Sequence, residues 1–142
     1  MSLDQIARDK GALVTATPDH SIEDAAKLMA EHDVGCIVVE RDDEPIGIVT
    51  DRDVALGVVA AEKDPASTTV SDIMTREPVT VHVDDGVYEL TEAMRDNSIR
   101  RMPVVDDDGA LAGIVTLDDV FVLVADEMHG LSEVIRAESP PY

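Results

Sequence analysis

The chain has 142 residues, enough for one ordinary domain or for two small units that pack together. Its 31 acidic residues against 11 basic ones give a formal net charge of -20, and such a surface repels nucleic acids and anionic membranes. We therefore expect no nucleic-acid partner and no membrane partner. The acidity is either an ordinary solvated face or an adaptation to high salt, whose counterions screen like charges, and we favour the second, halophilic interpretation. Because Trp is absent and aromatic residues make up only 2% of the chain, the core must be aliphatic.

Cysteine usage and the N-terminal segment both favour a soluble, cytoplasmic protein. Cys36 is the only cysteine, so no disulfide can form within the chain, as is usual in a reducing compartment. Residues 1–10 mix charged and isolated apolar residues and contain no hydrophobic region of a signal peptide. The longest uninterrupted apolar stretch, residues 54–61, is far shorter than the roughly 20 residues of a membrane span.

The first half of the chain predicts a helix, a hairpin and a second helix in that order. Ser21 is a helix cap, and the apolar residues within 22–29 follow the i, i+3, i+4, i+7 spacing of a helix that buries one face. Two β-branched runs, residues 35–40 and 46–50, flank turn residues and predict the hairpin. The second helix is expected from about residue 52 to residue 62.

The second half predicts the same order of elements after a linker. Residues 63–69 combine Pro, Ser and Thr, a composition typical of an exposed linker. An apolar stripe over residues 87–94 predicts a helix, and the runs 102–106 and 111–116 predict a hairpin. A last helix is expected from about residue 118 into the 130s.

The two halves are copies of one unit. Residues 47–54 return as residues 113–120 with six of eight positions identical, and further matches lie upstream at a spacing of 65 residues. Residues 70–74 begin the second copy. Each copy has the order strand, helix, strand, strand, helix, and we expect regular structure to stop at Gly130 and at Pro140–Pro141.

These copies resemble a pair of CBS domains, the modules named after cystathionine β-synthase. The resemblance is carried by the two Gly-Ile-Val-Thr-x-x-Asp segments that begin at Gly47 and Gly113, by Asp72-Ile73-Met74, and by residues 99–105. It covers nearly the entire chain and implies an α/β (α+β) fold of tandem β-α-β-β-α repeats, with two small sheets packed about a pseudo-twofold axis. The implied division is unit 1 over residues 6–62, a linker over 63–69, and unit 2 with a C-terminal helix over 70–137.

The recurring Thr-x-x-Asp motif, Thr50 with Asp53 and Thr116 with Asp119, has two interpretations that both stay open. In the structural one, Thr caps a helix and Asp adds only a favourable charge against the helix dipole. In the functional one, the Thr hydroxyl and the free amides attract a phosphate, and the carboxylate accepts hydrogen bonds from two ribose hydroxyls. The resemblance implies the functional roles, with adenine against apolar strand residues.

The resemblance further implies two ligand clefts, each completed by the opposite unit. In cleft 1, Thr50, Arg52 and Asp53 of unit 1 face residues of unit 2. These are Ser71, Ile99, Arg100, Arg101, Met102 and Pro103. In cleft 2, Thr116 and Asp119 of unit 2 face residues of unit 1. These are Val14, Thr15, Gly35, Cys36 and Ile37.

The clefts differ in charge. Gly35–Cys36 stands where Arg100–Arg101 stands in the other copy, and Leu117 replaces a polar residue. Arg neutralises phosphate well through its planar donor fork, although its ordinary role on an acidic surface is ion pairing. We therefore expect cleft 1 to bind phosphate and cleft 2 to bind a less anionic adenosyl ligand, or none.

The sequence contains no catalytic or metal-binding constellation, so we predict neither an enzyme nor a metal site. The four histidines lack a His or Cys partner at metal-ligand spacing, and Asp106–Asp108 lacks the calcium-loop pattern. Cys36 has no basic neighbour in sequence and is expected to be a small core hydrophobe. No nucleophile-elbow, Walker-type or dinucleotide-binding motif is present.

The predicted function is that of a regulatory sensor of AMP, ADP, ATP or S-adenosylmethionine, with no other cofactor required. A ligand that bridges both units favours one arrangement of the pair, which a separate effector protein could read. The alternative is a ligand-free structural or dimerisation module whose motifs serve only as helix caps. Because such pairs commonly dimerise in the family, we also expect a homodimer through apolar helix residues. These are Val54, Leu56, Val58, Val59, Val120, Val122, Leu123 and Val124.

Overall fold

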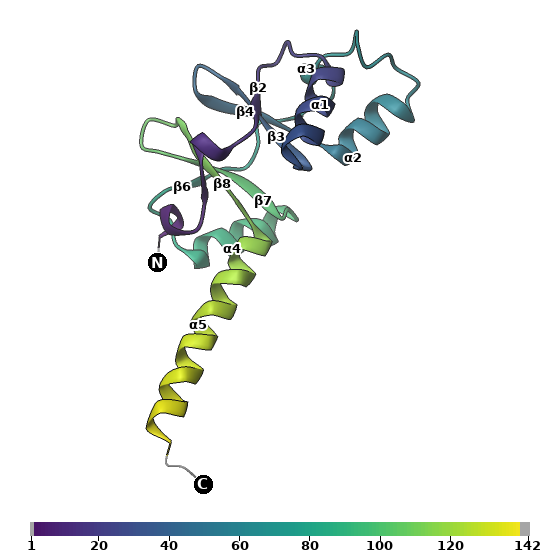
Figure 1. Cartoon of the computed structure of the whole chain (residues 1–142). Helices are drawn as coiled ribbons and strands as arrows, with labels where there is room; N and C mark the ends of the chain where they lie inside the picture. The colour runs from purple at the N-terminus through teal and green to yellow at the C-terminus, as the bar shows by residue number, and fades with distance from the viewer. Residues whose placement is uncertain (1, 140–142) are drawn as a thin grey trace.

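Two small four-stranded sheets with helices packed on them make up the computed structural model, which describes residues 2–139 (Figure 1). The strands are β1 (Arg8–Asp9), β2 (Thr15–Ala16), β3 (Cys36–Arg41), β4 (Glu44–Thr50), β5 (Thr75–Arg76), β6 (Val81–His82), β7 (Arg101–Val105) and β8 (Leu111–Thr116). The helices are the 3₁₀ turns η1 (Leu3–Gln5) and η2 (Lys10–Ala12), then α1 (Ile22–His32), α2 (Asp51–Val54), the π-helical turn η3 (Ala55–Val59), α3 (Val70–Ile73), α4 (Val87–Asn97) and α5 (Leu117–Glu138). The predicted α/β class with two small sheets is confirmed.

The same backbone pattern occurs in both sheets. The first sheet has the order β2-β3-β4-β5 and the second has β1-β8-β7-β6. In each, a short strand runs parallel to the first strand of a hairpin, and each hairpin carries one register shift near its turn. Helices α1 and α4 both end at a left-handed residue, Asp33 with φ 52° and Ser98 with φ 54°. The duplication in the sequence is therefore also a duplication of the backbone.

Each sheet takes one edge strand from the other half of the chain, which the sequence analysis did not predict. β5 lies after the linker yet pairs with β4, and β1 lies near the N-terminus yet pairs with β8. Glycines admit these edge strands, because a Cβ at Gly47 would overlap the Met74 side chain and a Cβ at Gly113 would overlap the Arg8 carbonyl. Strands of two residues show no alternation, so hydrophobic periodicity gives no signal for them.

Helices α1 and α4 confirm the predicted apolar stripes. The Ser21 Oγ accepts the Asp24 N–H at 3.1 Å and so caps α1 as expected. The N-cap of α4 is Gly86, whose N–H donates to Glu89 Oε2 at 3.0 Å. The buried members of the two stripes are Ile22, Ala25 and Met29 in α1, and Leu90 and Met94 in α4.

The predicted linker is exposed over residues 63–67, but its end packs on the first unit. Thr68 is buried, and its carbonyl accepts the Ile22 N–H at 2.9 Å. Val70 and Met74, which the sequence analysis assigned to the second copy, are buried in the first core. The unit boundaries drawn from the repeat spacing stay a prediction.

The last helix of each copy differs from its expected length. Helix α2 continues directly into η3 and ends at Val59, three residues before the predicted end. Helix α5 runs 22 residues and passes through Gly130, so the predicted stop at Gly130 is wrong. A glycine costs a helix only about 1 kcal/mol relative to alanine, which the neighbouring residues outweigh. Pro140–Pro141 lie outside the described residues. Within residues 2–139, no helix is both long and apolar enough to cross a membrane.

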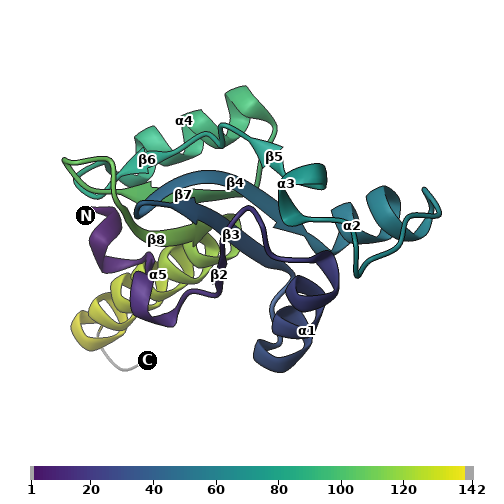
Figure 2. The same ribbon diagram turned by 90° about the horizontal axis from the view of Figure 1, so that it is seen from above.

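The core consists of three aliphatic clusters, as the composition requires. One lies under α1 on the first sheet and another under α4 on the second. The third joins the two sheets, where Val38 of β3 packs against Leu111 and Ile114 of β8. Figure 2 shows the two hairpins stacked in the middle of the molecule, with α1 and α4 on opposite sides. The sheets therefore pack on each other, and the clefts lie where the two hairpins meet the starts of α2 and α5.

Candidate functional site

Both Thr-x-x-Asp motifs form complete capping boxes, at the starts of α2 and α5. The Thr50 Oγ1 accepts the Asp53 N–H at 3.1 Å, and Asp53 Oδ2 accepts the Thr50 N–H at 2.9 Å. The Thr116–Asp119 pair repeats these bonds at 3.2 Å and 2.9 Å. The structural interpretation is confirmed in a stronger form, because each Asp accepts a backbone hydrogen bond instead of adding charge alone.

The capping role leaves part of each side chain available to a ligand. A Thr hydroxyl that accepts from an amide still has its own proton to donate, and each carboxylate uses only Oδ2 for the cap. All four side chains belong to half-buried residues, so the remaining groups are accessible. Each pair can therefore cap its helix and still offer one donor and one acceptor.

Cleft 1 has a volume of about 530 Å³ and lies between the end of β4 and the second half of the chain. Six of its predicted residues line it. These are Thr50, Arg52, Asp53, Ile99, Arg100 and Arg101. The sequence analysis missed seven further lining residues, several of them apolar. These are Ile48, Asp51, Thr75, Glu77, Pro78, Val79 and Ser98.

Three residues predicted for cleft 1 do not line it. Met102 is fully buried in the second core, and Pro103 is buried within β7. Ser71 lies on α3, where its hydroxyl accepts a hydrogen bond from Arg76 at 3.0 Å and its amide donates to the Pro18 carbonyl. Strand alternation explains Met102, which points to the side of the sheet opposite to Arg101. Pro103 lies on the Arg101 side but is buried where it pairs with Ile114 of β8.

Cleft 2 is smaller, about 310 Å³, and contains four of its predicted residues. These are Val14, Gly35, Cys36 and Thr116. Ile37 is fully buried in the first core, Thr15 lies in β2, and Asp119 turns its carboxylate toward the cap. The lining residues that the sequence analysis did not assign to this cleft include four charged ones, Arg8, Asp33, Arg101 and Asp118.

The charge difference between the clefts is smaller than the repeat alignment suggested. Cleft 1 is lined by three arginines and three carboxylates, and cleft 2 by two arginines and two carboxylates. Arg101 lines both clefts, although the sequence analysis placed it only in cleft 1. An ion pair of 3.5 Å joins Arg100 of cleft 1 to Asp118 of cleft 2. Cleft 2 therefore has one arginine fewer than cleft 1, and the expectation that it binds a less anionic ligand stays a prediction.

Cys36 lies at the centre of this arrangement. It starts β3 in the position where Arg101 starts β7, and the two side chains are neighbours. Burial raises the pKa of the Cys36 thiol, while the Arg101 guanidinium partly opposes that rise. The thiol is therefore protonated at neutral pH, as expected of a small core side chain and not of a nucleophile.

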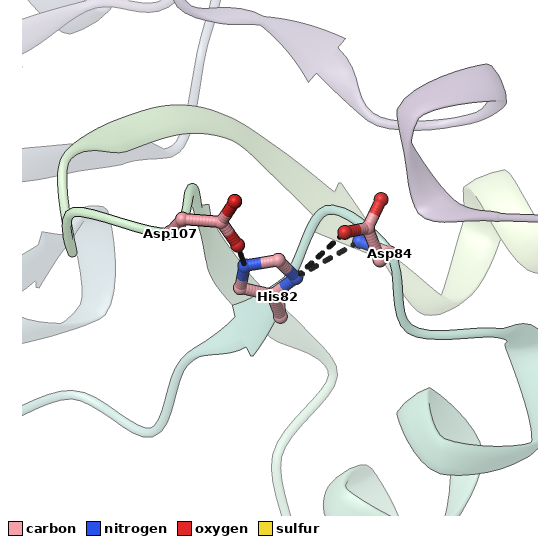
Figure 3. A group of neighbouring side chains, drawn as sticks. All are labelled: His82, Asp84 and Asp107. Carbon is pink, nitrogen blue, oxygen red and sulfur yellow. Dashed lines mark hydrogen bonds and ion pairs between the residues drawn. The ribbon is translucent and has the colours of Figure 1, made fainter.

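A histidine and two carboxylates meet at the far end of the second sheet (Figure 3). The His82 Nε2 lies 2.7 Å from Asp107 Oδ1, and Nδ1 accepts the Asp84 N–H at 3.1 Å. The sequence spacing gave no sign of this group, because Asp107 comes from the hairpin turn opposite β6. A metal ion on Nε2 would place the ring proton on Nδ1, where the Asp84 amide already donates. His82 therefore links the turn after β6 to the turn of the second hairpin through its contacts with Asp84 and Asp107.

The comparisons with known proteins agree with this geometry. The CBS domain family model matches residues 7–59 and 70–126. The chain is 37% identical over 110 residues to the CBS domain-containing protein YhcV of Bacillus subtilis, covering 78% of this chain and 77% of that one. It is 40% identical over 122 residues to an uncharacterised protein of Methanopyrus kandleri, covering 85% of this chain but only 61% of the relative.

A solved CBS pair shows the same fold with ligands bound. The CBS domain pair of protein MJ0100, crystallised in complex with 5′-methylthioadenosine and S-adenosyl-L-methionine, superposes with a TM-score of 0.78 and 30% sequence identity. The match covers 89% of this chain and 98% of that one. The chain therefore belongs to the CBS domain family, whose paired repeats are regulatory ligand-binding modules and not catalytic domains.

Proposed function

We propose that this chain is a sensor that binds an adenine nucleotide or another adenosyl ligand, such as AMP, ADP, ATP or S-adenosylmethionine, between its two repeats. The composition of cleft 1 carries the proposal. One wall comes from residues 48–53 of the first repeat and the other from residues 75–79 and 98–101 of the second half. The adenosyl compounds bound by the related pair support the same ligand class.

The side chains of cleft 1 match the three parts of a nucleotide. Ile48, Val79 and Ile99 offer an apolar surface for the base. The free oxygen of Asp53 accepts hydrogen bonds from ribose hydroxyls. Arg52 lines the same cleft and is a suitable phosphate partner.

The proposed mechanism is regulatory. A ligand in cleft 1 contacts both repeats, so it stabilises the arrangement of the repeats that fits it best. A separate effector protein then reads the difference between the ligand-free and the ligand-bound arrangement. This mechanism needs no catalytic group and no other cofactor.

Thermal melts with AMP, ADP, ATP and S-adenosylmethionine test the proposal. A ligand at a hundred times its dissociation constant adds about 2.7 kcal/mol to the stability of the folded state and raises the melting temperature. Asp53→Asn keeps an oxygen for the Thr50 N–H but replaces the free acceptor with a donor, so it removes the shift for a ligand of cleft 1. Asp119→Asn is the matched control. An unchanged melting temperature with all four ligands contradicts the proposal.

A second function is favoured by one observation. Both Thr-x-x-Asp pairs are already satisfied as capping boxes, which is the state expected of a ligand-free structural module. In that case neither Asp→Asn variant changes any ligand response, because no ligand binds. The melts above separate the two functions.

We also propose a homodimer, formed mainly through α5. Of the residues expected at the interface, Val58 and Val120 are buried in their own cores and are excluded from it. Instead, α5 projects from the body and exposes a seam of apolar residues (Figure 1). The seam alternates spacings of three and four residues, as in a coiled coil, and an identical helix supplies a matching seam. Its members are Phe121, Val124, Met128, Leu131 and Ile135, each between 46% and 67% exposed.

Light scattering during gel filtration tests the dimer. Val124→Asp places a charge in the seam and is expected to give a monomer. Val122, which the sequence analysis also expected at the interface, lies two residues from Val124 and outside the seam. Val122→Asp adds the same charge at a side chain that is 62% exposed and is expected to leave the dimer intact. A wild-type monomer, or a dimer that survives Val124→Asp, contradicts this interface.

Finally, we propose that the acidic surface is an adaptation to high salt. At about 1 M salt the screening length falls to roughly 3 Å, so repulsion among the 31 acidic side chains is largely removed. The melting temperature should fall when molar KCl is replaced by dilute buffer. An equal melting temperature in both solutions contradicts the proposal.

A further inference from the structure

Arg101 lies where the two clefts meet. It begins β7, pairs in register with Thr116 of β8, is half-buried, and lines both clefts. Within residues 2–139, no carboxylate lies within 4.0 Å of its guanidinium, although the chain has 31 acidic residues. Its cation is therefore not committed to an ion pair there and can serve a ligand in either cleft.

A second link between the clefts is the pair formed by Arg100 and Asp118. Arg100 lines cleft 1, Asp118 lines cleft 2, and their side-chain atoms are 3.5 Å apart. The side chains are 72% and 83% exposed. An exposed pair of this kind contributes little to stability, so a ligand can exchange its partners at little cost.

We propose that, through these residues, a phosphorylated ligand in one cleft weakens the binding of a phosphorylated ligand in the other. The proposal rests on the proposed function, because it needs a phosphorylated ligand in cleft 1. Such a ligand draws Arg101 and Arg100 toward its phosphate, since guanidinium groups bind phosphate oxygens through paired hydrogen bonds. Cleft 2 then loses Arg101, and Asp118 loses its partner. The charged groups that remain there are Arg8, Asp33 and Asp118, which disfavour a second anion.

The consequence is selection by ligand charge. A chain with AMP in cleft 1 binds a second AMP weakly, while an uncharged adenosyl ligand in cleft 2 is little affected. By linkage, an anion in cleft 2 weakens binding in cleft 1 by the same factor. The second binding event thus reports the charge of the ligand as well as its concentration.

Calorimetric titration with AMP tests this coupling. In Asp53→Asn, which disables cleft 1, AMP binds to cleft 2 alone and gives a reference dissociation constant. In the wild type, the second AMP should bind on the order of ten-fold more weakly than this reference. The same comparison in an Arg101→Gln background should give a smaller difference, because only the pair of Arg100 and Asp118 then links the clefts. The double variant Arg101→Gln/Asp118→Asn should give equal affinities.

Three controls isolate the charge mechanism. Arg52→Gln changes a residue that lines cleft 1 only. It weakens binding of the first AMP but keeps the ten-fold difference between the second AMP and the reference. Asp118→Asn reduces this ten-fold difference. Because the Asp118 side chain is exposed, the substitution should not disturb folding, so this test does not depend on whether an Arg101 variant folds. Adenosine carries no phosphate, so it should bind to cleft 2 with the same affinity in the wild type and in Asp53→Asn.

The outcomes separate this inference from the proposed function. Two independent AMP sites in the wild type overturn the coupling and leave the sensor function in place. A ten-fold difference that is unchanged in Arg101→Gln, or that adenosine shows equally, overturns the role of charge. Absence of any AMP, ADP, ATP or S-adenosylmethionine binding overturns the sensor function together with the coupling.

Discussion

The two clefts share one backbone design and differ in the side chains that line them. In each, a hairpin strand ends at a Thr that caps the following helix, and the four capping distances agree within 0.1 Å between the copies. In each, the residue after that Thr donates its N–H to a carbonyl at the start of the opposite hairpin strand. These bonds are Asp51 to Gly35 at 3.0 Å and Leu117 to Arg100 at 2.8 Å.

Some differences between the copies fall on residues that line the clefts. Gly35 and Cys36 correspond to Arg100 and Arg101, and the polar Asp51 corresponds to Leu117. Buried positions keep their apolar character in both copies, because the two cores need it. The comparison teaches that the fold constrains the core of each copy more tightly than the residues that line its cleft.

The largest expected effect tests whether the two cores are equivalent. Ile37 and Met102 occupy equivalent positions, and both are fully buried. Ile37→Ala and Met102→Ala should each lower the free energy of unfolding by about 2–5 kcal/mol, through lost apolar burial and the cavity left behind. Urea denaturation measures both. A loss below about 1 kcal/mol for one of them would show that the cores are not equivalent.

A smaller effect distinguishes the two exchanged edge strands. Gly113→Ala places a Cβ against the Arg8 carbonyl, which is backbone and cannot move freely. It should cost about 1–3 kcal/mol. Gly47→Ala meets the Met74 side chain, which is flexible, and should cost less. Equal costs in thermal unfolding would argue that both edges adapt in the same way.

The capping boxes provide the next comparison. Thr50→Ala and Thr116→Ala each remove a hydrogen bond to the amide of the third helical residue, and each should cost about 1 kcal/mol. Thr→Ser at the same positions retains the hydroxyl and serves as the control. If neither Thr→Ala variant changes the denaturation midpoint, the structural role of the motif is contradicted.

The smallest expected effect concerns the contact between Cys36 and Arg101. The Arg101 guanidinium lowers the pKa of the Cys36 thiol against the larger opposing effect of burial. Arg101→Gln should therefore raise that pKa further, and alkylation of Cys36 by iodoacetamide should require a higher pH. Arg52→Gln is the control, since Arg52 is not among the groups that shift the thiol. A pH profile that moves downward in Arg101→Gln would contradict this contact.

Much of the local structure was predictable from the sequence. The Ser21 cap, the buried stripe of α1 and both hairpins follow from short-range patterns, namely cap residues, periodicity and turn chemistry. The positions of Thr50 and Thr116 at helix starts follow for the same reason. Gly130 misled the prediction, because a glycine inside a helix is a modest local cost that a long apolar helix tolerates.

The candidate site was predictable only in part. Six of the residues expected in cleft 1 line it. Met102 points away from it, since neighbouring strand residues alternate between the faces of a sheet, and Pro103 is buried within β7. Pro78 of the cleft wall belongs to no motif, whereas Val79 could have been assigned from the repeat, which pairs it with Val14 of cleft 2 at a spacing of 65 residues. The second role of Arg101 had no signal in the repeat alignment, because that alignment assigns each residue to one copy.

The sequence by itself determined the duplication, the aliphatic core, the acidic surface and the family, since these depend on composition and on short motifs repeated in register. Only the tertiary structure decided which edge strand joins which sheet and which side chains meet between the sheets. These features depend on contacts between residues far apart in the chain, and no local pattern encodes them. Arg101 therefore appears as one of two adjacent arginines in the sequence and as the shared cation of two clefts in the fold.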